Sequence, residues 1–398
     1  MDSPSDPSGV IGDFVRSLPA VQQPDWSEAG QLAHVTDELS HMPALVTWDE
    51  VRTLRSLLAE VAAGKVQVIQ SGDCAEDPAE CCLGYVARKA ALLDVLAGVM
   101  KINSLRPVIR VGRIAGQFGK PRSKPTELVD GRELPVFRGH MVNSPEPDPE
   151  LRIPLPERLL VGYRAARTAV DILRHRTVVG APIAEAPIWT SHEALLLDYE
   201  LPLLRRLPDG AGVLLSSTHW PWIGDRTRQL DGAHVALLAS VANPVASKVG
   251  PGMAVEELLA LCARLDPHRE PGRLTLISRM GADRVAGALP PLVAAVREAG
   301  HPVSWLCDPM HGNTVTAPSG LKTRLVDTVI REVERFQDAV DRAGGVAGGL
   351  HLETTPDDVT ECAAHAGRVD EVPGKYTSFC DPRLNPEQAI AVASAWRS

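Results

Sequence analysis

The stretch VQVIQSGDCAE (residues 66–76) joins a short apolar run to a cluster of polar groups, and this arrangement recurs along the chain. Apolar runs of strand length lie at residues 66–70, 107–112, 186–190, 213–218, 246–250, 274–278, 303–307 and 348–353. Between most of them lie amphipathic segments with helical spacing, such as residues 87–100, 289–300 and 328–345. Strands that alternate with helices predict a parallel sheet. Because an open doubly wound sheet usually has fewer strands and a glycine fingerprint after the first, the pattern favours a closed (β/α)8 TIM barrel.

The predicted barrel is a single domain over residues 21–398, with an N-terminal helical extension and one inserted segment. Helices are expected within residues 21–64, because residues 49–64 have apolar positions at helical spacing and stop at Gly64. The inserted segment, residues 114–185, lies between the second and third strands and is expected to form a lid or an interface, with one clear helix at 156–174. Residues 1–20 are predicted to be a disordered tail.

Composition narrows the class of protein. The chain has 398 residues, of which 44% are apolar, so a large buried core is expected. Its formal charge of −9 is spread without acidic or basic blocks, which argues against a nucleic-acid or polybasic membrane surface. No apolar run approaches the roughly 20 residues of a spanning helix, and the first residues do not resemble a signal peptide, so a cytoplasmic location is expected. The seven cysteines, an odd number, predict reduced thiols or metal ligands rather than a disulfide framework.

Chemically active side chains lie at or just after the ends of the apolar runs, which in a barrel is the catalytic face. They are Cys74, Arg113, His192, Glu193, His219, Lys248, Arg279, Asp308, His311 and Glu353. Several of them, with Arg226, could form a ring of cations around an anionic ligand, although single basic residues at strand ends are usually only solvated.

A second group is eligible by residue type to bind a divalent ion. Cys74, His311, Glu353 and Asp381 offer one thiolate, one imidazole and two carboxylates, which suit such an ion with positions left open for substrate. They do not form a short-range metal motif, and each would more often be structural.

Two local motifs have simpler interpretations. GRIAGQFGKPRS (residues 112–123) lacks the Walker pattern, since Ile114 and Pro121 stand at the wrong positions, so an ATP site of that type is excluded. The loop still carries Arg113, Lys120 and Arg122, which either converge on an anion or face solvent. TSHE (residues 190–193) fits a helix capping box, with Thr190 as the N-cap.

Seven ordered segments resemble the signatures of class II 3-deoxy-D-arabino-heptulosonate 7-phosphate (DAHP) synthases. They are QSGDCAE (70–76), GRIAGQFGKPRS (112–123), SHEALLLDYE (191–200), WIGDRTRQLDGAH (222–234), LTLISRMG (274–281), CDPMHGNT (307–314) and CDPRLN (380–385). The resemblance runs from about residue 20 to the end of the chain. It implies a (β/α)8 barrel, in agreement with the strand count.

The resemblance also implies an activity, the condensation of phosphoenolpyruvate with erythrose 4-phosphate to give DAHP and phosphate. On this basis Cys74, His311, Glu353 and Asp381 would bind the metal, commonly Mn²⁺ or Co²⁺ in relatives. The residues implied in phosphoenolpyruvate binding are Arg113, Lys120, Arg226, Lys248 and Arg279. The loop with Lys120, Arg122 and Ser123 resembles the segment that holds the aldose phosphate. The residues expected to take part in catalysis are Lys248, Glu193, Asp225, Cys74 and His311, with Glu193 and Asp225 orienting water or pairing with the cations.

Three positions depart from the family pattern: Ser71 replaces a usual glycine, Asp225 a frequent glutamate and His140 a usual aspartate. They make the second substrate the open question. The alternatives are erythrose 4-phosphate, a modified aldose phosphate such as the 4-amino-4-deoxy form, or an inactive paralogue that only binds ligand or partner. The stretch between Asn143 and Thr190 is short for the family, which predicts weak or absent feedback by aromatic amino acids and a role in secondary metabolism. Relatives are often dimers or tetramers, so a homo-oligomer is expected.

Overall fold

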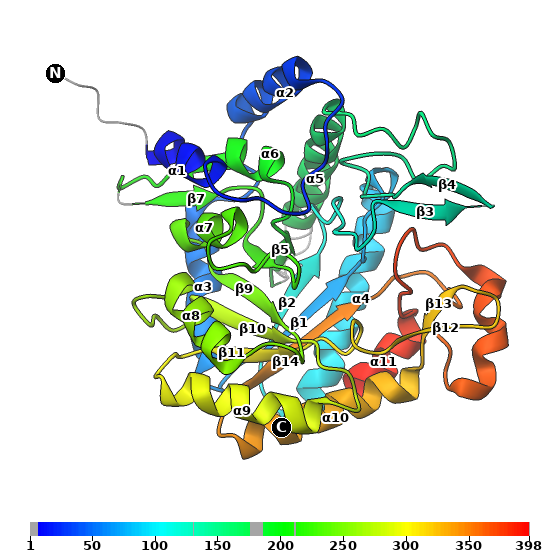
Figure 1. The fold of residues 1–398 in the computed structure, drawn as a ribbon. Coiled ribbons are helices and arrows are strands. Elements are labelled where there is room, and N and C mark those ends of the chain that lie inside the picture. Colours follow the sequence, from blue (N-terminus) through cyan, green and yellow to red (C-terminus); the bar gives the residue numbers. More distant parts are fainter. Residues whose placement is uncertain (1–6, 130, 176–185, 211, 398) are drawn as a thin grey trace.

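The computed structural model describes residues 7–129, 131–175, 186–210 and 212–397. Within these ranges, parallel strands close into an eight-stranded barrel (Figure 1). Their order around the barrel is β1 (Gln67–Gly72), β14 (Ala347–Glu353), β11 (Ser304–Cys307), β10 (Leu274–Ser278), β9 (Val245–Val249), β8 (Trp220–Ile223), β5 (Ile188–Glu193) and β2 (Val108–Arg113). Since β2 pairs again with β1, the sheet has no free edge. The predicted (β/α)8 barrel is confirmed.

The prediction of the fourth strand is wrong. The apolar run at residues 213–218 contributes β7 (Val213–Leu215), which pairs antiparallel with β6 (Leu204–Arg206) in a hairpin outside the barrel. The barrel strand is β8, which follows directly and contains Pro221. Because proline lacks an N–H donor, its presence argues against a central strand, and the sequence pattern therefore favoured the wrong run.

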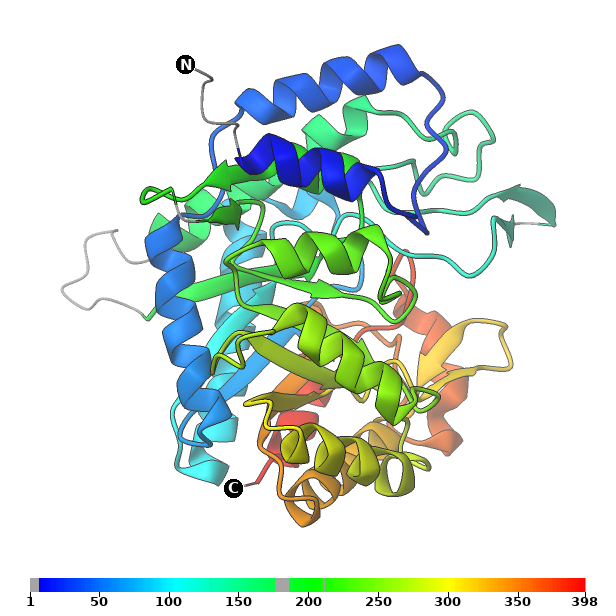
Figure 2. The ribbon, with the colours of Figure 1, turned by 60° about the vertical axis from the view of Figure 1, so that its left-hand side comes forward.

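The helices form a layer outside the barrel (Figures 1 and 2). They include α4 (Leu83–Ser104), α5 (Glu157–His175), α7 (Ala233–Ser240), α8 (Val255–Leu265), α9 (Val285–Glu298), α10 (Val326–Arg342) and α11 (Pro386–Ser394). Further helical segments are η1 (Pro78–Glu80), α6 (Leu197–Glu200), η2 (Leu201–Leu203) and η3 (Ala366–Lys375). Among the described helices, none is both long and apolar enough to cross a membrane.

Two further hairpins extend beyond the barrel strands. One, β3 (Thr126–Val129) with β4 (Arg132–Pro135), belongs to the inserted segment, whose predicted helix at 156–174 is α5. The other is β12 (Thr314–Thr316) with β13 (Lys322–Arg324), after β11. Both lie to the side toward which the barrel strands point in Figure 1.

One helix, α3 (Trp48–Ala62), closes the end of the barrel from which the strands start (Figures 1 and 2). It begins at a capping box, in which the Thr47 hydroxyl accepts from the Glu50 amide and the Glu50 carboxylate accepts from the Thr47 amide. Its apolar residues Leu54, Leu58 and Val61 pack in one cluster with side chains from the barrel strands, Trp220 among them. This end of the barrel is therefore closed by apolar packing.

The chain before α3 is also structured, in α1 (Pro7–Arg16) and α2 (Ala29–His41). The predicted disordered tail is thus wrong for residues 7–16. The helix α1 packs against α7 and β6, and Val15 is fully buried. Ile11, Val15 and Leu18 recur at helical spacing and join the main core, which gives this segment enough apolar surface to dock.

We expect Val15→Ala to lower the free energy of unfolding by about 1–3 kcal/mol, since it leaves a small cavity where α1 meets the core. Phe14→Ala is the matched control, because Phe14 is 46% exposed on the same helix. Urea unfolding of both variants measures the difference. Equal stability of the two would mean that α1 is not docked.

Candidate active site

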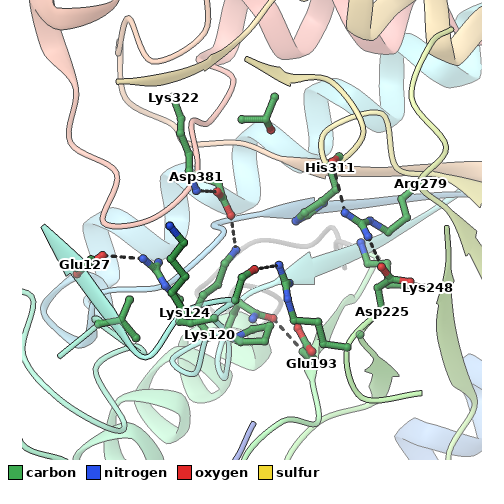
Figure 3. Close-up of a pocket in the computed structure, with 18 of the residues that line it drawn as sticks. Lys120, Lys124, Glu127, Glu193, Asp225, Lys248, Arg279, His311, Lys322 and Asp381 are labelled. Atoms are coloured by element: carbon green, nitrogen blue, oxygen red, sulfur yellow. Dashed lines mark hydrogen bonds and ion pairs between the residues drawn. The ribbon is translucent and has the colours of Figure 1, made fainter. Parts of the chain in front are cut away.

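A cavity of about 820 Å³ lies at the carboxyl ends of the barrel strands (Figure 3). The predicted site residues that line it are Arg113, Lys120, Arg122, Ser123, Glu193, Asp225, Arg226, Lys248, Arg279, His311 and Asp381. The other two predicted residues, Cys74 and Glu353, are buried and contact lining residues. The β3–β4 hairpin adds Glu127 and Leu128 to the same wall.

The barrel explains why residues so far apart in sequence meet here. Arg113, Glu193 and Glu353 are the last residues of β2, β5 and β14, and Lys248 is the penultimate residue of β9. Parallel strands end at a common rim, and the loops that follow them carry the remaining side chains to the same place.

The buried carboxylate of Glu353 lies among cations. It is 2.9 Å from Arg324 Nη2, 3.0 Å from Arg113 Nη2 and 3.7 Å from Lys120 Nζ, and His311 Nε2 lies 3.3 Å away. Burial alone would raise the pKa of Glu353, but His311, Lys120, Arg324 and Arg113 lower it by more, so the pKa lies below its ordinary value. This carboxylate is therefore an anion throughout the physiological range.

His311, Glu353 and Asp381 each offer one ligand atom, and these atoms lie within 4.8 Å of one another. The His311 imidazole is oriented by Asp308, whose Oδ2 lies 2.8 Å from Nδ1, which leaves Nε2 facing Glu353. Such a carboxylate–histidine pair is the usual support of a metal-binding imidazole. Although burial opposes it, Lys120 and Arg324 hold the pKa of Asp381 well below its ordinary value, so both carboxylates are ready to bind a cation. One nitrogen and two oxygen donors fit a divalent transition ion.

Cys74, the fourth predicted ligand, lies outside this three-residue group but next to it. Its Sγ accepts from the Asp381 amide at 3.4 Å. A hydrogen bond from the Cys380 thiol, helped by Lys120 and opposed by burial, lowers the pKa of Cys74 to about 7. This shift favours the thiolate of Cys74, the form that binds metals.

Basic side chains form much of the remaining wall. Lys248 pairs with the buried Asp308, and burial, with a smaller contribution from Arg113, lowers the pKa of Lys248 to about 8. Arg279 Nη1 lies 2.5 Å from Asp225 Oδ2, and Arg226 donates to the Ser123 hydroxyl at 2.6 Å. Figure 3 shows Lys120, Lys248 and Arg279 around one central space. An anionic ligand of more than one charge suits such a wall.

Glu193 contrasts with these cations because it is a half-buried acid for which the described residues provide no ion pair. Burial raises its pKa, although Lys120, Lys248 and Arg226 oppose the shift. Its Oε1 has no hydrogen-bond partner among the described residues. A Cβ on Gly224 would lie 2.0 Å from this oxygen, so a glycine is needed there to leave room for the carboxyl group. A carboxyl group in this position can hold or release a proton at the cavity.

A sequence profile of the class-II DAHP synthetase family matches residues 12–185 and 177–396. The chain belongs to this family. It is 56% identical over 380 residues to a probable phospho-2-dehydro-3-deoxyheptonate aldolase of Pseudomonas fluorescens, covering 95% of each chain. Identity to the phospho-2-dehydro-3-deoxyheptonate aldolase of Streptomyces coelicolor is 39%, over 97% of this chain and 96% of that one. This enzyme is therefore a transferase of the DAHP synthase type.

A solved structure of phospho-2-dehydro-3-deoxyheptonate aldolase from Francisella tularensis shares the fold. It aligns with a TM-score of 0.53 at 12% sequence identity and covers 100% of this chain and 99% of that one.

Of the three departures from the family pattern, the enzyme places only Asp225 on the cavity wall. Ser71 is buried, with its hydroxyl 2.7 Å from that of Thr354. His140 donates from Nδ1 to the Glu76 carbonyl at 3.0 Å and packs edge-on against Phe137 and Phe379. Neither is among the described residues that line the cavity.

The capping box predicted at residues 190–193 is wrong, because these residues belong to β5. His192 is buried, and its Nε2 lies 2.7 Å from the Glu200 carboxylate. It therefore has a structural contact and does not line the cavity. The local sequence pattern fits a cap, but pairing with β2 and β8 fixes the segment as a strand.

Sequence reasoning missed some residues of the site. Arg324 lies on β13, a three-residue strand without an apolar run to mark it. Trp222, over which the Arg113 guanidinium lies at 5.3 Å, was missed because its strand was misplaced. Lys322, which pairs with Asp381 at 3.0 Å, lies on the same short hairpin as Arg324.

We expect Arg324→Met to lower the free energy of unfolding of the metal-free enzyme by about 3–5 kcal/mol, because it removes one partner of a buried ion pair. Lys322→Met is the matched control: Lys322 also pairs with an acid of this group, but its side chain is 51% exposed, so about 1 kcal/mol or less is expected. Urea unfolding in EDTA measures both. Similar losses would show that the burial of Arg324 does not set its contribution.

Proposed function

We propose that this enzyme condenses phosphoenolpyruvate with D-erythrose 4-phosphate and water to give DAHP and phosphate. The observation that carries the proposal is the convergence of basic side chains and the His311, Glu353 and Asp381 group on one cavity. The two substrates together bring two phosphates and one carboxylate into one pocket, and fixed cations are needed to offset their repulsion. The names of the family relatives point to the same reaction.

Arg113, Lys120, Arg226, Lys248 and Arg279 are proposed to bind phosphoenolpyruvate. Arg113 and Lys248 belong to barrel strands, and Arg279 follows β10 directly, so these cations are held by the sheet. Lys120, Arg122 and Ser123 are proposed to hold the aldose phosphate, since this loop lies beside the β3–β4 hairpin, with Arg122 paired to Glu127 at 2.7 Å. The two ligands would then meet in front of Glu193, which is proposed, with Asp225, to orient water or move a proton.

Cys74, His311, Glu353 and Asp381 are proposed to bind Mn²⁺ or Co²⁺. When bound, such an ion supplies Lewis-acid polarisation of the aldehyde oxygen. The chain supports this set without the ion: Asp308 holds the His311 ring, and Lys120 and Lys322 each lie 3.0 Å from the Asp381 carboxylate.

The positions of the three departures support erythrose 4-phosphate over a modified aldose. Ser71 and His140 lie away from the described cavity wall, and Asp225 pairs with Arg279 rather than with the Lys120 loop.

We also propose a role in secondary metabolism. The alignment to the Streptomyces relative spans 434 positions against 398 residues here, consistent with the short stretch between Asn143 and Thr190.

The test is the loss of the ultraviolet absorbance of phosphoenolpyruvate in the presence of purified, Mn²⁺-loaded enzyme. We expect loss only when erythrose 4-phosphate is added, no loss in EDTA, and recovery with Mn²⁺. Loss with the 4-amino-4-deoxy analogue alone would replace the second substrate. No loss with either aldose would contradict the proposed reaction.

The proposed metal set is tested separately by calorimetry with Mn²⁺. Asp381→Asn is expected to weaken Mn²⁺ binding about tenfold or more, because it removes a charged ligand. Asp225→Asn is the control, an acid of the same cavity outside the proposed set. If both variants bind Mn²⁺ equally well, Asp381 is not a ligand.

Lys248 predicts a pH dependence. With a pKa of about 8, it is a cation below that pH and loses its proton above it. Because the cation is the form that attracts phosphoenolpyruvate, the affinity for phosphoenolpyruvate should fall by up to about tenfold per pH unit above pH 8. Lys248→Arg, which stays charged, should bind phosphoenolpyruvate with an affinity that is constant between pH 7 and 9. The same decline in this variant would assign the falling limb to another group.

A further inference from the structure

His351 lies on a barrel strand, is not among the residues that line the cavity, and has no role in the proposed reaction. It belongs to β14, two residues before Glu353, so both side chains are on the same face of the strand. Its side chain is completely buried. The edge of the His351 ring meets Trp222, the residue on which Arg113 rests, with ring centres 5.2 Å apart.

A chain of directed hydrogen bonds fixes which nitrogen of His351 carries the proton. The Ser191 hydroxyl donates to the Gly112 carbonyl at 3.0 Å, so its oxygen is free to accept from Gln70 Nε2, also at 3.0 Å. This sets the orientation of the Gln70 amide and places Oε1 2.6 Å from His351 Nδ1. An amide oxygen only accepts, so Nδ1 carries the hydrogen and Nε2 offers a lone pair.

The lone pair of Nε2 faces two cations of the cavity wall. Arg113 Nη1 lies 2.6 Å from it and Lys248 Nζ lies 2.8 Å from it. Because both cations donate to this one nitrogen, they are held within two hydrogen-bond lengths of each other despite their electrostatic repulsion. Each has one further anionic partner, Glu353 for Arg113 and Asp308 for Lys248.

We propose that His351 is a positioning residue for phosphoenolpyruvate: its neutral Nδ1–H form accepts from Arg113 and Lys248 together and sets their spacing. Gln70 and Ser191 act one step further away, because they select this form of the ring. The inference rests on the proposed function, since it takes phosphoenolpyruvate as the ligand of these two cations. It adds that a residue with no access to the cavity determines the affinity for one substrate and not for the other.

The test compares His351→Leu with His351→Gln. Leucine removes the acceptor, whereas the glutamine side-chain oxygen can take the place of Nε2. Calorimetry with phosphoenolpyruvate alone gives Kd, and steady-state kinetics give kcat and the two KM values. We expect His351→Leu to raise Kd and KM for phosphoenolpyruvate about tenfold or more, with KM for erythrose 4-phosphate changed less than about twofold. His351→Gln should recover most of the affinity.

Two controls separate positioning from stability. His234→Leu removes a buried histidine of α7, whose Nε2 is near the Leu195 carbonyl, and should lower Tm without changing KM for phosphoenolpyruvate. Gln70→Leu leaves His351 in place but removes the acceptor of its Nδ1–H, so a smaller rise in the same KM is expected. This variant keeps the proposal testable if His351→Leu does not fold.

The outcomes also distinguish this inference from the proposed reaction. An unchanged Kd for phosphoenolpyruvate in a folded His351→Leu enzyme, or equal losses in His351→Leu and His351→Gln, would overturn the role of His351 alone. Altered phosphoenolpyruvate binding without turnover of any aldose phosphate would support it and overturn the condensation. A wild-type enzyme that does not bind phosphoenolpyruvate would overturn both.

Discussion

A buried carboxylate stays ionised only where cations surround it, and this constraint organises the site around Glu353. Its partners come from separate parts of the chain: Arg113 from β2, Lys120 from the loop after β2, His311 from the loop after β11 and Arg324 from β13. One anion thus ties together segments that share no local sequence relationship. Because Arg113, Lys120 and His311 also face the cavity, the charges that hold the rim of the barrel are the same ones that meet the ligand. Stability and binding are therefore coupled at this point.

Most of the barrel could be predicted from apolar runs because each buried parallel strand is a short apolar segment bounded by loops. The failures are physically informative. β8 consists of tryptophan, proline and isoleucine, and burial of its two indoles inside the barrel outweighs the missing proline donor. At the other extreme, Val213–Leu215 has the composition of a central strand and is buried, but it pairs in a hairpin outside the barrel. Composition alone does not specify which neighbour a strand finds.

The sequence allows most residues of the site to be predicted, but not which of their side chains contact one another. Strand ends marked Arg113, Glu193, Lys248, Arg279 and His311 among the lining residues, and the family resemblance assigned roles to them. No sequence signal pointed to Arg324, which compensates Glu353 across a long sequence separation. His351 could be recognised only as one histidine among several, because its significance lies in the distances to Arg113 and Lys248. Such pairings arise from barrel closure, which periodicity does not encode.

The helix α3 gives the amino-terminal extension a part in keeping the barrel soluble. Leu54, Leu58 and Val61 cover a floor of apolar side chains that includes Trp220 and Val68. A chain trimmed to begin at β1 would keep all the strands and all the predicted site residues, yet would present this floor to water. Contiguous apolar surface of that kind promotes self-association. A fragment that folds without self-association should therefore include α3, although this helix lies at the end of the barrel opposite the candidate active site.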